Sequence, residues 1–306
     1  MILFVSGRCD IPAFYSEWFF NRIRAGFVDV RNPYDAHQLS RIHLTKSNID
    51  ACLFCTKNPS PMINRLDEIP FPYLFHITLT PYHHDIEPHV PDKQQVIQAM
   101  ITLSEKIGKE RVVLRYDPVL INDRYTMEYH QKAFQKLIDQ VAPYISTVIF
   151  SFVDIYKNTT QHAKELSLHP ITKTEMIQCA KVFSKIVKPY GLTLQTCAET
   201  IDLSEYGIKN GACISKEIME QLLHHPYDPP HGKAVRNCNC LPTVDIGDYN
   251  ACPHYCRYCY ANYNEEAVKQ RCLTHNPGAS VLIGEVTAED HIKIRTEKQH
   301  RQIPLF

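Results

Sequence analysis

The sequence predicts an α/β fold of the (β/α) TIM-type or partial-barrel class. Apolar runs of strand length alternate with helical patterns along most of the chain, which is typical of a parallel sheet covered by helices. The 306 residues are 44% hydrophobic and 22% charged, enough for one large core. Polar residues follow most of the apolar runs, as they do at the active-site rim of such barrels.

Strands and helices are expected to alternate from the first residues onward. Pro12 suits the first turn of a helix, where its missing N–H costs nothing, and Asp92 is a good capping residue. The turn-forming Asn32-Pro33-Tyr34-Asp35 predicts a small hairpin between residues 27–31 and 39–44. The other expected strands are residues 2–6, 49–55, 73–80, 111–116, 147–153, 192–197 and 245–249, and the expected helices are 12–25, 92–107, 127–141 and 172–188.

Charge and composition exclude several classes of protein. The net charge is zero, so no broad basic surface indicates nucleic-acid binding. The first eight residues lack the basic region of a signal peptide, and no stretch approaches the ~18 apolar residues of a membrane-spanning helix. Twelve cysteines in a chain without an export signal therefore favour metal ligands and buried thiols in a cytoplasmic protein over disulfides.

The strongest motif is a knot of three cysteines, Cys252-Pro253-His254-Tyr255-Cys256-Arg257-Tyr258-Cys259-Tyr260. Neighbouring thiolates repel one another unless a metal offsets their charge, and short cysteine runs of this kind hold iron–sulfur clusters. Three ligands for a four-iron cube leave one iron open for chemistry. Zinc is the alternative. Because zinc takes four ligands, it would need a fourth from His254, Cys238 or Cys240.

The spacing Cys-x3-Cys-x-Tyr-Cys resembles the signature of radical S-adenosylmethionine (radical SAM) enzymes. The resemblance implies a [4Fe–4S] cluster on Cys252, Cys256 and Cys259, with SAM on the open iron and Tyr258 near its adenine. In that family the loop usually follows the first barrel strand, whereas here it comes last. A circular permutation explains the difference, because the first and last strands of a barrel are neighbours. A helix at 260–271 would then replace the family's first helix.

Residues 49–154 are similar to the spore photoproduct lyase branch of radical SAM proteins. That branch has Thr-Lys-Ser-Pro, Ser-Ile-Thr-Thr and Glu-Pro-x-x-Pro motifs in the order seen here for Thr56-Lys57-Asn58-Pro59, Ile77-Thr78-Leu79-Thr80 and Glu87-Pro88-x-x-Pro91. The similarity implies that Lys57 contacts the SAM carboxylate and that Thr78 or Thr80 lines the same pocket. Asn58 replaces the branch's serine, which leaves its role open. Over the whole chain, the early Ser-Gly-Arg-x-Asp-Ile-Pro and the late cysteine loop resemble the DUF1848 family.

Other charged residues follow the expected strands. Arg115 is a candidate for catalysis and cofactor binding, or else it only neutralises Asp117. Asp117 and Glu199 are candidate catalytic residues, and Glu199 and Asp154 are candidates for proton transfer. The alternative for all of them is that loops are polar in general.

Four further cysteines form a candidate second metal site: Cys197, Cys213, Cys238 and Cys240. If the rim brings them together, they have the donors for an auxiliary iron–sulfur cluster or zinc. Otherwise each is an ordinary thiol in the core or a loop.

The expected organisation is a barrel core at 1–235, a cysteine-rich segment at 236–283 that completes the barrel, and a polar, helix-like tail at 284–306. The resemblance implies a radical SAM enzyme that reductively cleaves SAM to a 5′-deoxyadenosyl radical. Its substrate would be a DNA or nucleotide lesion, a small molecule or a peptide, and its electron donor a flavodoxin or ferredoxin. The alternative is a non-catalytic iron–sulfur or zinc protein acting as a redox sensor or nucleic-acid adaptor.

The end of the chain suggests a partner. Gln302-Ile303-Pro304-Leu305-Phe306 resembles the short peptide by which bacterial repair and replication proteins dock on the DNA sliding clamp. Leu305 and Phe306 would be the apolar anchors.

Overall fold

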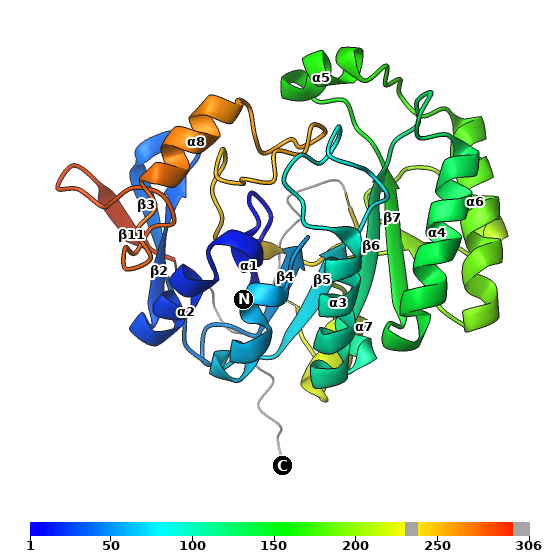
Figure 1. Cartoon of the computed structure of the whole chain (residues 1–306). Coiled ribbons are helices and arrows are strands. Elements are labelled where there is room, and N and C mark those ends of the chain that lie inside the picture. Colours follow the sequence, from blue (N-terminus) through cyan, green and yellow to red (C-terminus); the bar gives the residue numbers. More distant parts are fainter. Residues whose placement is uncertain (230–237, 296–306) are drawn as a thin grey trace.

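An open sheet of eight parallel strands forms the centre of the molecule (Figure 1). The computed structural model describes residues 1–229 and 238–295. The strand order is β10-β1-β4-β5-β6-β7-β8-β9, so β10 and β9 lie at the two edges. The predicted α/β fold is confirmed, and the sheet is consistent with a partial barrel. Its strands are β1 (Ile2–Phe4), β4 (Ala51–Thr56), β5 (Tyr73–Thr78), β6 (Val112–Val119), β7 (Thr147–Phe152), β8 (Thr193–Thr196), β9 (Lys209–Asn210) and β10 (Thr243–Asp245).

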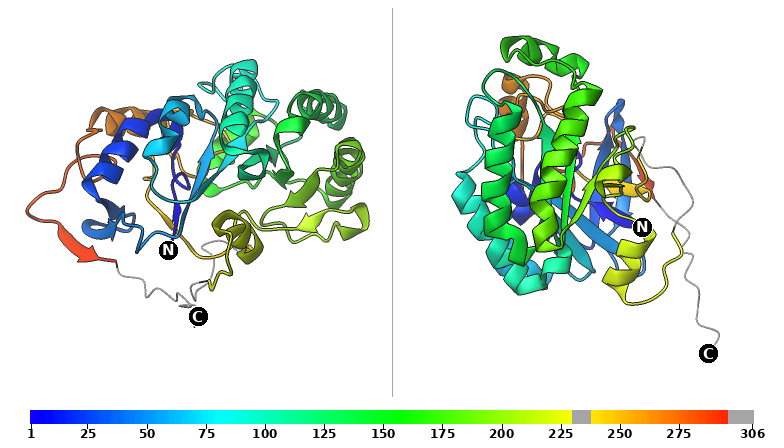
Figure 2. Two further views of the ribbon diagram at one scale, coloured as in Figure 1. Left: turned by 90° about the horizontal axis from the view of Figure 1, so that it is seen from below. Right: turned by 90° about the vertical axis from the view of Figure 1, so that its right-hand side faces the viewer.

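Seen from below, the sheet is an arc with most helices along its outer side and α7 on its inner side (Figure 2). None of the described helices has both the length and the apolar character needed to cross a membrane. The helices are α1 (Ile11–Phe14), α2 (Ser16–Ala25), α3 (Lys93–Ile107), α4 (Met127–Val141), α5 (Thr160–Glu165), α6 (Lys173–Val187), α7 (Lys216–Leu223) and α8 (Glu265–Leu273).

The outer face of the sheet carries the main core. Side chains alternate between the two faces along each strand, and Tyr116 and Phe150 project toward α6. Their rings lie 5.4 and 5.5 Å from that of Phe183, centroid to centroid. Each fully buried side chain of this size contributes about 1.5–3 kcal/mol, so this packing fixes the helices on the sheet.

The inner face has a smaller apolar cluster, in which Leu53 of β4 and Leu74 of β5 pack with Met219 of α7. Because the alternation continues along the strands, the next inward positions on β4 and β5 are Cys55 and His76. On the inner face of the sheet, the side chains therefore change from apolar to polar toward the carboxyl ends of the strands.

A three-stranded sheet lies beside the barrel. β2 (Phe27–Asn32) and β3 (Asp35–His43) form the predicted hairpin. β11 (His291–Ile294) pairs with β3 in parallel, so the prediction of a helix-like tail is wrong for these residues. An ion pair of 2.7 Å between Arg31 and Asp290 holds the chain just before β11 against the hairpin.

Three predicted boundaries are also wrong. The helix expected at 12–25 is divided into α1 and α2, since Tyr15 has the non-helical φ of −131°. The strand expected at 245–249 is instead β10, which ends at Asp245, where the carboxylate turns back to accept from the Gly247 N–H. The helix expected at 260–271 begins at Glu265 because Asn264 caps it through the Ala267 N–H.

Candidate active site at the carboxyl end of the sheet

The three-cysteine loop follows β10, which pairs with β1 in parallel. First and last core strands are therefore neighbours, as expected. The loop crosses to the segment after β5, where the Arg257 N–H donates to the Ile86 carbonyl. On its far side the Asn158 amide donates to the carbonyls of Cys259 and Asn262, at 3.1 and 2.8 Å. The loop is thus tied to both sides of the sheet's carboxyl end.

The three thiols are half-buried and influence one another electrostatically. Burial raises the pKa of Cys252 well above its usual range, and the charges of Asp10, Cys259 and Cys256 raise it further. Burial also raises the pKa of Cys256 to about 12, against the opposing charge of Lys57. The thiols are therefore protonated without a metal. Metal binding would displace these protons, because cysteine binds metals as the thiolate.

These three sulfurs are not grouped as closely as the ligands of a single zinc ion. Zn–S bonds of about 2.3 Å in a tetrahedron place sulfurs roughly 3.8 Å apart. Within the described part of the chain, the sulfurs of Cys252, Cys256 and Cys259 do not all lie within 4.8 Å of one another. A cube of four irons binds each thiolate through a different iron, so it needs the wider spacing.

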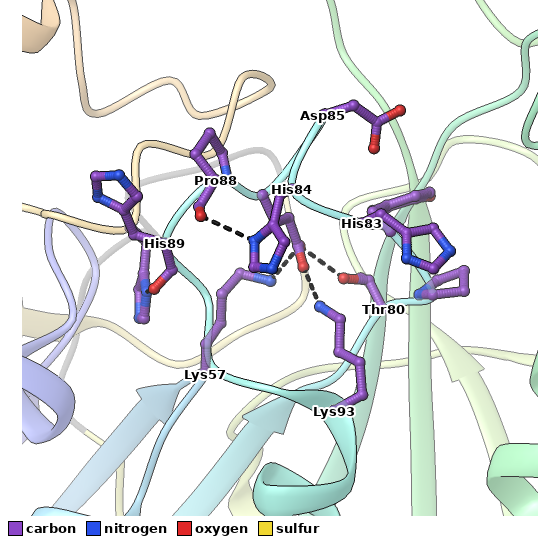
Figure 3. A network of polar contacts seen from close by, with 12 residues as sticks. Lys57, Thr80, His83, His84, Asp85, Pro88, His89 and Lys93 are labelled. Carbon is purple, nitrogen blue, oxygen red and sulfur yellow. Dashed lines mark hydrogen bonds and ion pairs between the residues drawn. The ribbon is translucent and has the colours of Figure 1, made fainter.

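Beside the loop, Glu87 is the centre of a buried polar network (Figure 3). Its carboxylate accepts from the Lys57 ammonium at 2.7 Å, the Thr80 hydroxyl at 2.6 Å and the Tyr258 hydroxyl at 2.5 Å. Lys93 pairs with its second oxygen. Lys57 and Thr80, which follow β4 and β5, and Lys93 at the start of α3 point toward one another. The polar ends of neighbouring elements therefore converge here.

The charges in this network are strongly coupled. Although burial favours the neutral form, the charges of Lys57 and Lys93 lower the pKa of Glu87 to about 2. Burial alone would lower the pKa of Lys57, but the charge of Glu87 raises it above its usual value. Two ammonium groups share one carboxylate, so the network carries an excess positive charge.

A second bridge joins the loop to the first strands. The Asp10 carboxylate accepts from the Lys57 N–H at 2.8 Å and contacts His254 Nε2 at 3.0 Å. Asp10 also caps α1 by accepting from the Ala13 N–H. This carboxylate fixes the cysteine loop and the Lys57 backbone relative to each other.

The structure separates the predicted residues into two groups. Lys57, Tyr258 and Thr80 lie with the three-cysteine loop, whereas Thr78 ends β5 in register with Arg115. Arg115 instead binds Asp117 and donates to the Cys213 sulfur at 2.9 Å.

Glu199 caps the end of β7 by accepting from the Phe152 N–H at 2.8 Å. Burial raises its pKa, and the charges of Asp154 and Asp117 raise it further. Its contact with the backbone holds the loop after β8 against β7.

Three of the four cysteines of the candidate second site come together. Cys197 and Cys213 lie 3.0 Å apart at their sulfurs, and the Cys213 N–H donates to the Cys240 sulfur at 3.1 Å. Cys238 does not belong to the group.

Two residues of the site, Glu87 and Lys93, were not predicted as site residues. His254 was considered only as a zinc ligand, and here it contacts Asp10. Glu87 was part of the Glu-Pro-x-x-Pro motif, but nothing in the sequence indicates that two lysines surround it. The clamp-like segment 302–306 lies outside the described residues.

Comparison with known proteins identifies the family of this chain. The family model described as "Domain of unknown function (DUF1848)" matches residues 2–261. No curated protein matches the chain. Among solved structures, an alpha-L-fucosidase candidate from Bacteroides thetaiotaomicron VPI-5482 is 11% identical, with a TM-score of 0.26 over 64% of this chain and 76% of that chain. A TM-score this low supports no inference about activity.

Proposed function

The chain belongs to the DUF1848 family, and from this premise we propose that it is a radical SAM enzyme. The observation that carries the proposal is the meeting of three thiols, a buried lysine and a half-buried tyrosine at the carboxyl end of a parallel sheet, where barrel enzymes place their active sites. Cys252, Cys256 and Cys259 would hold a [4Fe–4S] cluster. When bound and reduced, that cluster supplies the electron that cleaves SAM to methionine and a 5′-deoxyadenosyl radical.

The residues around the loop suit a ligand that carries a carboxylate. Lys57 and Lys93 share Glu87, so Lys57 can bind a ligand carboxylate while Lys93 keeps Glu87 neutralised. A carboxylate entering here meets net positive charge in a place of low dielectric, where ion pairs are strong. Lys57 would therefore orient SAM by its carboxylate.

Tyr258 is positioned by the same network. Its hydroxyl donates to Glu87, and the Lys57 ammonium lies 5.7 Å from the centre of its ring. A half-buried ring fixed through its hydroxyl provides an apolar surface against which an adenine can stack.

Anaerobic reconstitution with iron and sulfide tests this function. After reduction with dithionite, the protein is expected to release 5′-deoxyadenosine from SAM, measured by chromatography. Cys256→Ala should abolish this release, and Cys179→Ala, which changes a buried thiol of α6, should not. A colourless zinc protein that leaves SAM intact would refute the proposal and support the non-catalytic alternative.

A further inference from the structure

Cys197, Cys213 and Cys240 form a tight group apart from the three-cysteine loop. All three sulfurs lie within 4.8 Å of one another, and no fourth Cys, His, Asp or Glu among residues 1–229 and 238–295 belongs to the group. They come from three separate segments: the end of β8, the chain after β9 and the chain before β10. Their closeness is therefore a product of the fold, not of local spacing.

We propose that these cysteines bind a single thiophilic divalent ion of the zinc class, independently of the cluster on the three-cysteine loop. Tetrahedral zinc places its thiolates roughly 3.8 Å apart, which matches a group this compact. A four-iron cube would spread its ligands over separate irons. The fourth position is left for water or an incoming ligand, as in zinc sites that are not closed by protein.

The surroundings of the group support a thiolate at Cys213. Three thiolates and one divalent ion carry a net negative charge, and the buried Arg115 guanidinium donates to the Cys213 sulfur at 2.9 Å. On its other side the Arg115 guanidinium donates from Nε and Nη2 to Asp117 Oδ2, at 3.0 and 2.6 Å. Backbone and side-chain donors to ligand sulfurs are the usual second layer of a metal–thiolate site.

The site also has a place in the architecture. β9 and β10 are opposite edges of the sheet, and α7 comes between them in the chain. Cys213 precedes α7 and Cys240 follows it, and beside them the Leu241 N–H donates to the Ile214 carbonyl. An ion bound by Cys197, Cys213 and Cys240 would fasten the chain before α7 and the chain before β10 to the end of β8.

Cobalt titration tests the site without the cluster. In the Cys252→Ala/Cys256→Ala/Cys259→Ala variant, kept reduced, about one equivalent of Co²⁺ should bind with the intense visible bands of tetrahedral cobalt thiolate. Adding Cys213→Ala should remove these bands, and adding Cys179→Ala should leave them. Arg115→Gln should weaken Co²⁺ affinity about 10–100-fold, with partial recovery in Arg115→Lys.

Two results would overturn the proposal: absence of the tetrahedral bands, or a Cys197–Cys213 disulfide found by thiol counting and peptide mapping. If the triple variant does not fold, zinc is measured by mass spectrometry in the full-length Cys213→Ala and Cys179→Ala proteins. About one zinc should then be missing from Cys213→Ala alone, and equal zinc in both would refute the site. Because none of these assays uses SAM, their outcome is separate from that of the radical SAM proposal.

Discussion

The Lys57 ammonium lies 2.7 Å from the Glu87 carboxylate, which is 1% exposed and also binds Lys93. Glu87 therefore has two ammonium partners, one more than is needed to neutralise it, and either can leave while the other remains. This asymmetry makes the two residues respond differently to substitution.

Glu87→Gln should destabilise the protein by roughly 3–5 kcal/mol, because it leaves two buried ammonium groups without a counter-charge. Lys57→Met should cost less than half as much, since Lys93 still neutralises Glu87. Urea unfolding of both variants measures the difference. Lys57→Met should nevertheless abolish SAM binding by the reconstituted protein, and equal destabilisation by the two variants would contradict the shared-carboxylate arrangement.

Asn158→Ala should loosen the cysteine loop, because its amide is removed from the carbonyls of Cys259, Tyr260 and Asn262. Each buried acceptor left unpaired costs about 1–3 kcal/mol. We expect the reconstituted variant to lose iron several-fold faster in air, followed by visible absorption. Asn21→Ala, which removes a similar amide-to-carbonyl bond at an exposed site, is the control and should retain iron like the wild type.

Gly7→Ala should disturb the junction of β1 and β10. A Cβ at this position would lie 1.8 Å from Asp245 Oδ2, so the Asp245 carboxylate must rotate and give up Arg8 and the Gly247 N–H. Overpacking of this kind costs typically about 1–3 kcal/mol. In a double-mutant cycle with Asp245→Ala, the two effects should be strongly non-additive, and simple additivity would place the clash elsewhere.

His130 should make the protein sensitive to acid. It is fully buried between the Tyr116 hydroxyl and the Leu120 carbonyl, and burial lowers its pKa to about 4. The unfolded chain binds this proton near pH 6.5, so the stability from neutral His130 is complete above pH 6.5 and falls as the pH drops toward 4.

The loss attributable to His130 should reach roughly 3 kcal/mol across that range. Thermal unfolding at several pH values should show a flatter profile for His130→Gln than for wild type. His76 contributes in the same direction, because burial lowers its pKa to about 4 as well.

Long, locally consistent patterns were predictable from the sequence. The strands β1 and β4 to β7 could be recognised because each is largely an apolar run, and α4 has its expected bounds of Met127–Val141. β10 was misplaced because a strand of three residues has too little pattern to distinguish it from the chain around Asp245. β11 was missed because its side chains are exposed. Only its pairing with β3 identifies these residues as a strand.

The site was predictable only where its residues share a motif. The cysteine loop, Lys57 and Tyr258 are visible in the sequence, but the enclosure of Glu87 by Lys93 depends on how α3 packs. The sequence suggested a common site for Cys197, Cys213, Cys238 and Cys240, of which Cys238 lies outside the group. It did not indicate the approach of Arg115 from β6. Contacts between distant strands follow from register, which the local sequence does not specify.

The pairing of β10 with β1 has a consequence for how the protein matures. Residues 2–4 are made first and must await 243–245 before the edge of the sheet is complete, a contact of very high sequence separation. During synthesis, domains fold from the amino end, so the thiols of the cysteine loop reach their site only after nearly all of the sheet has formed. If the loop binds the proposed cluster, its iron would consequently be loaded into a protein whose sheet has already formed.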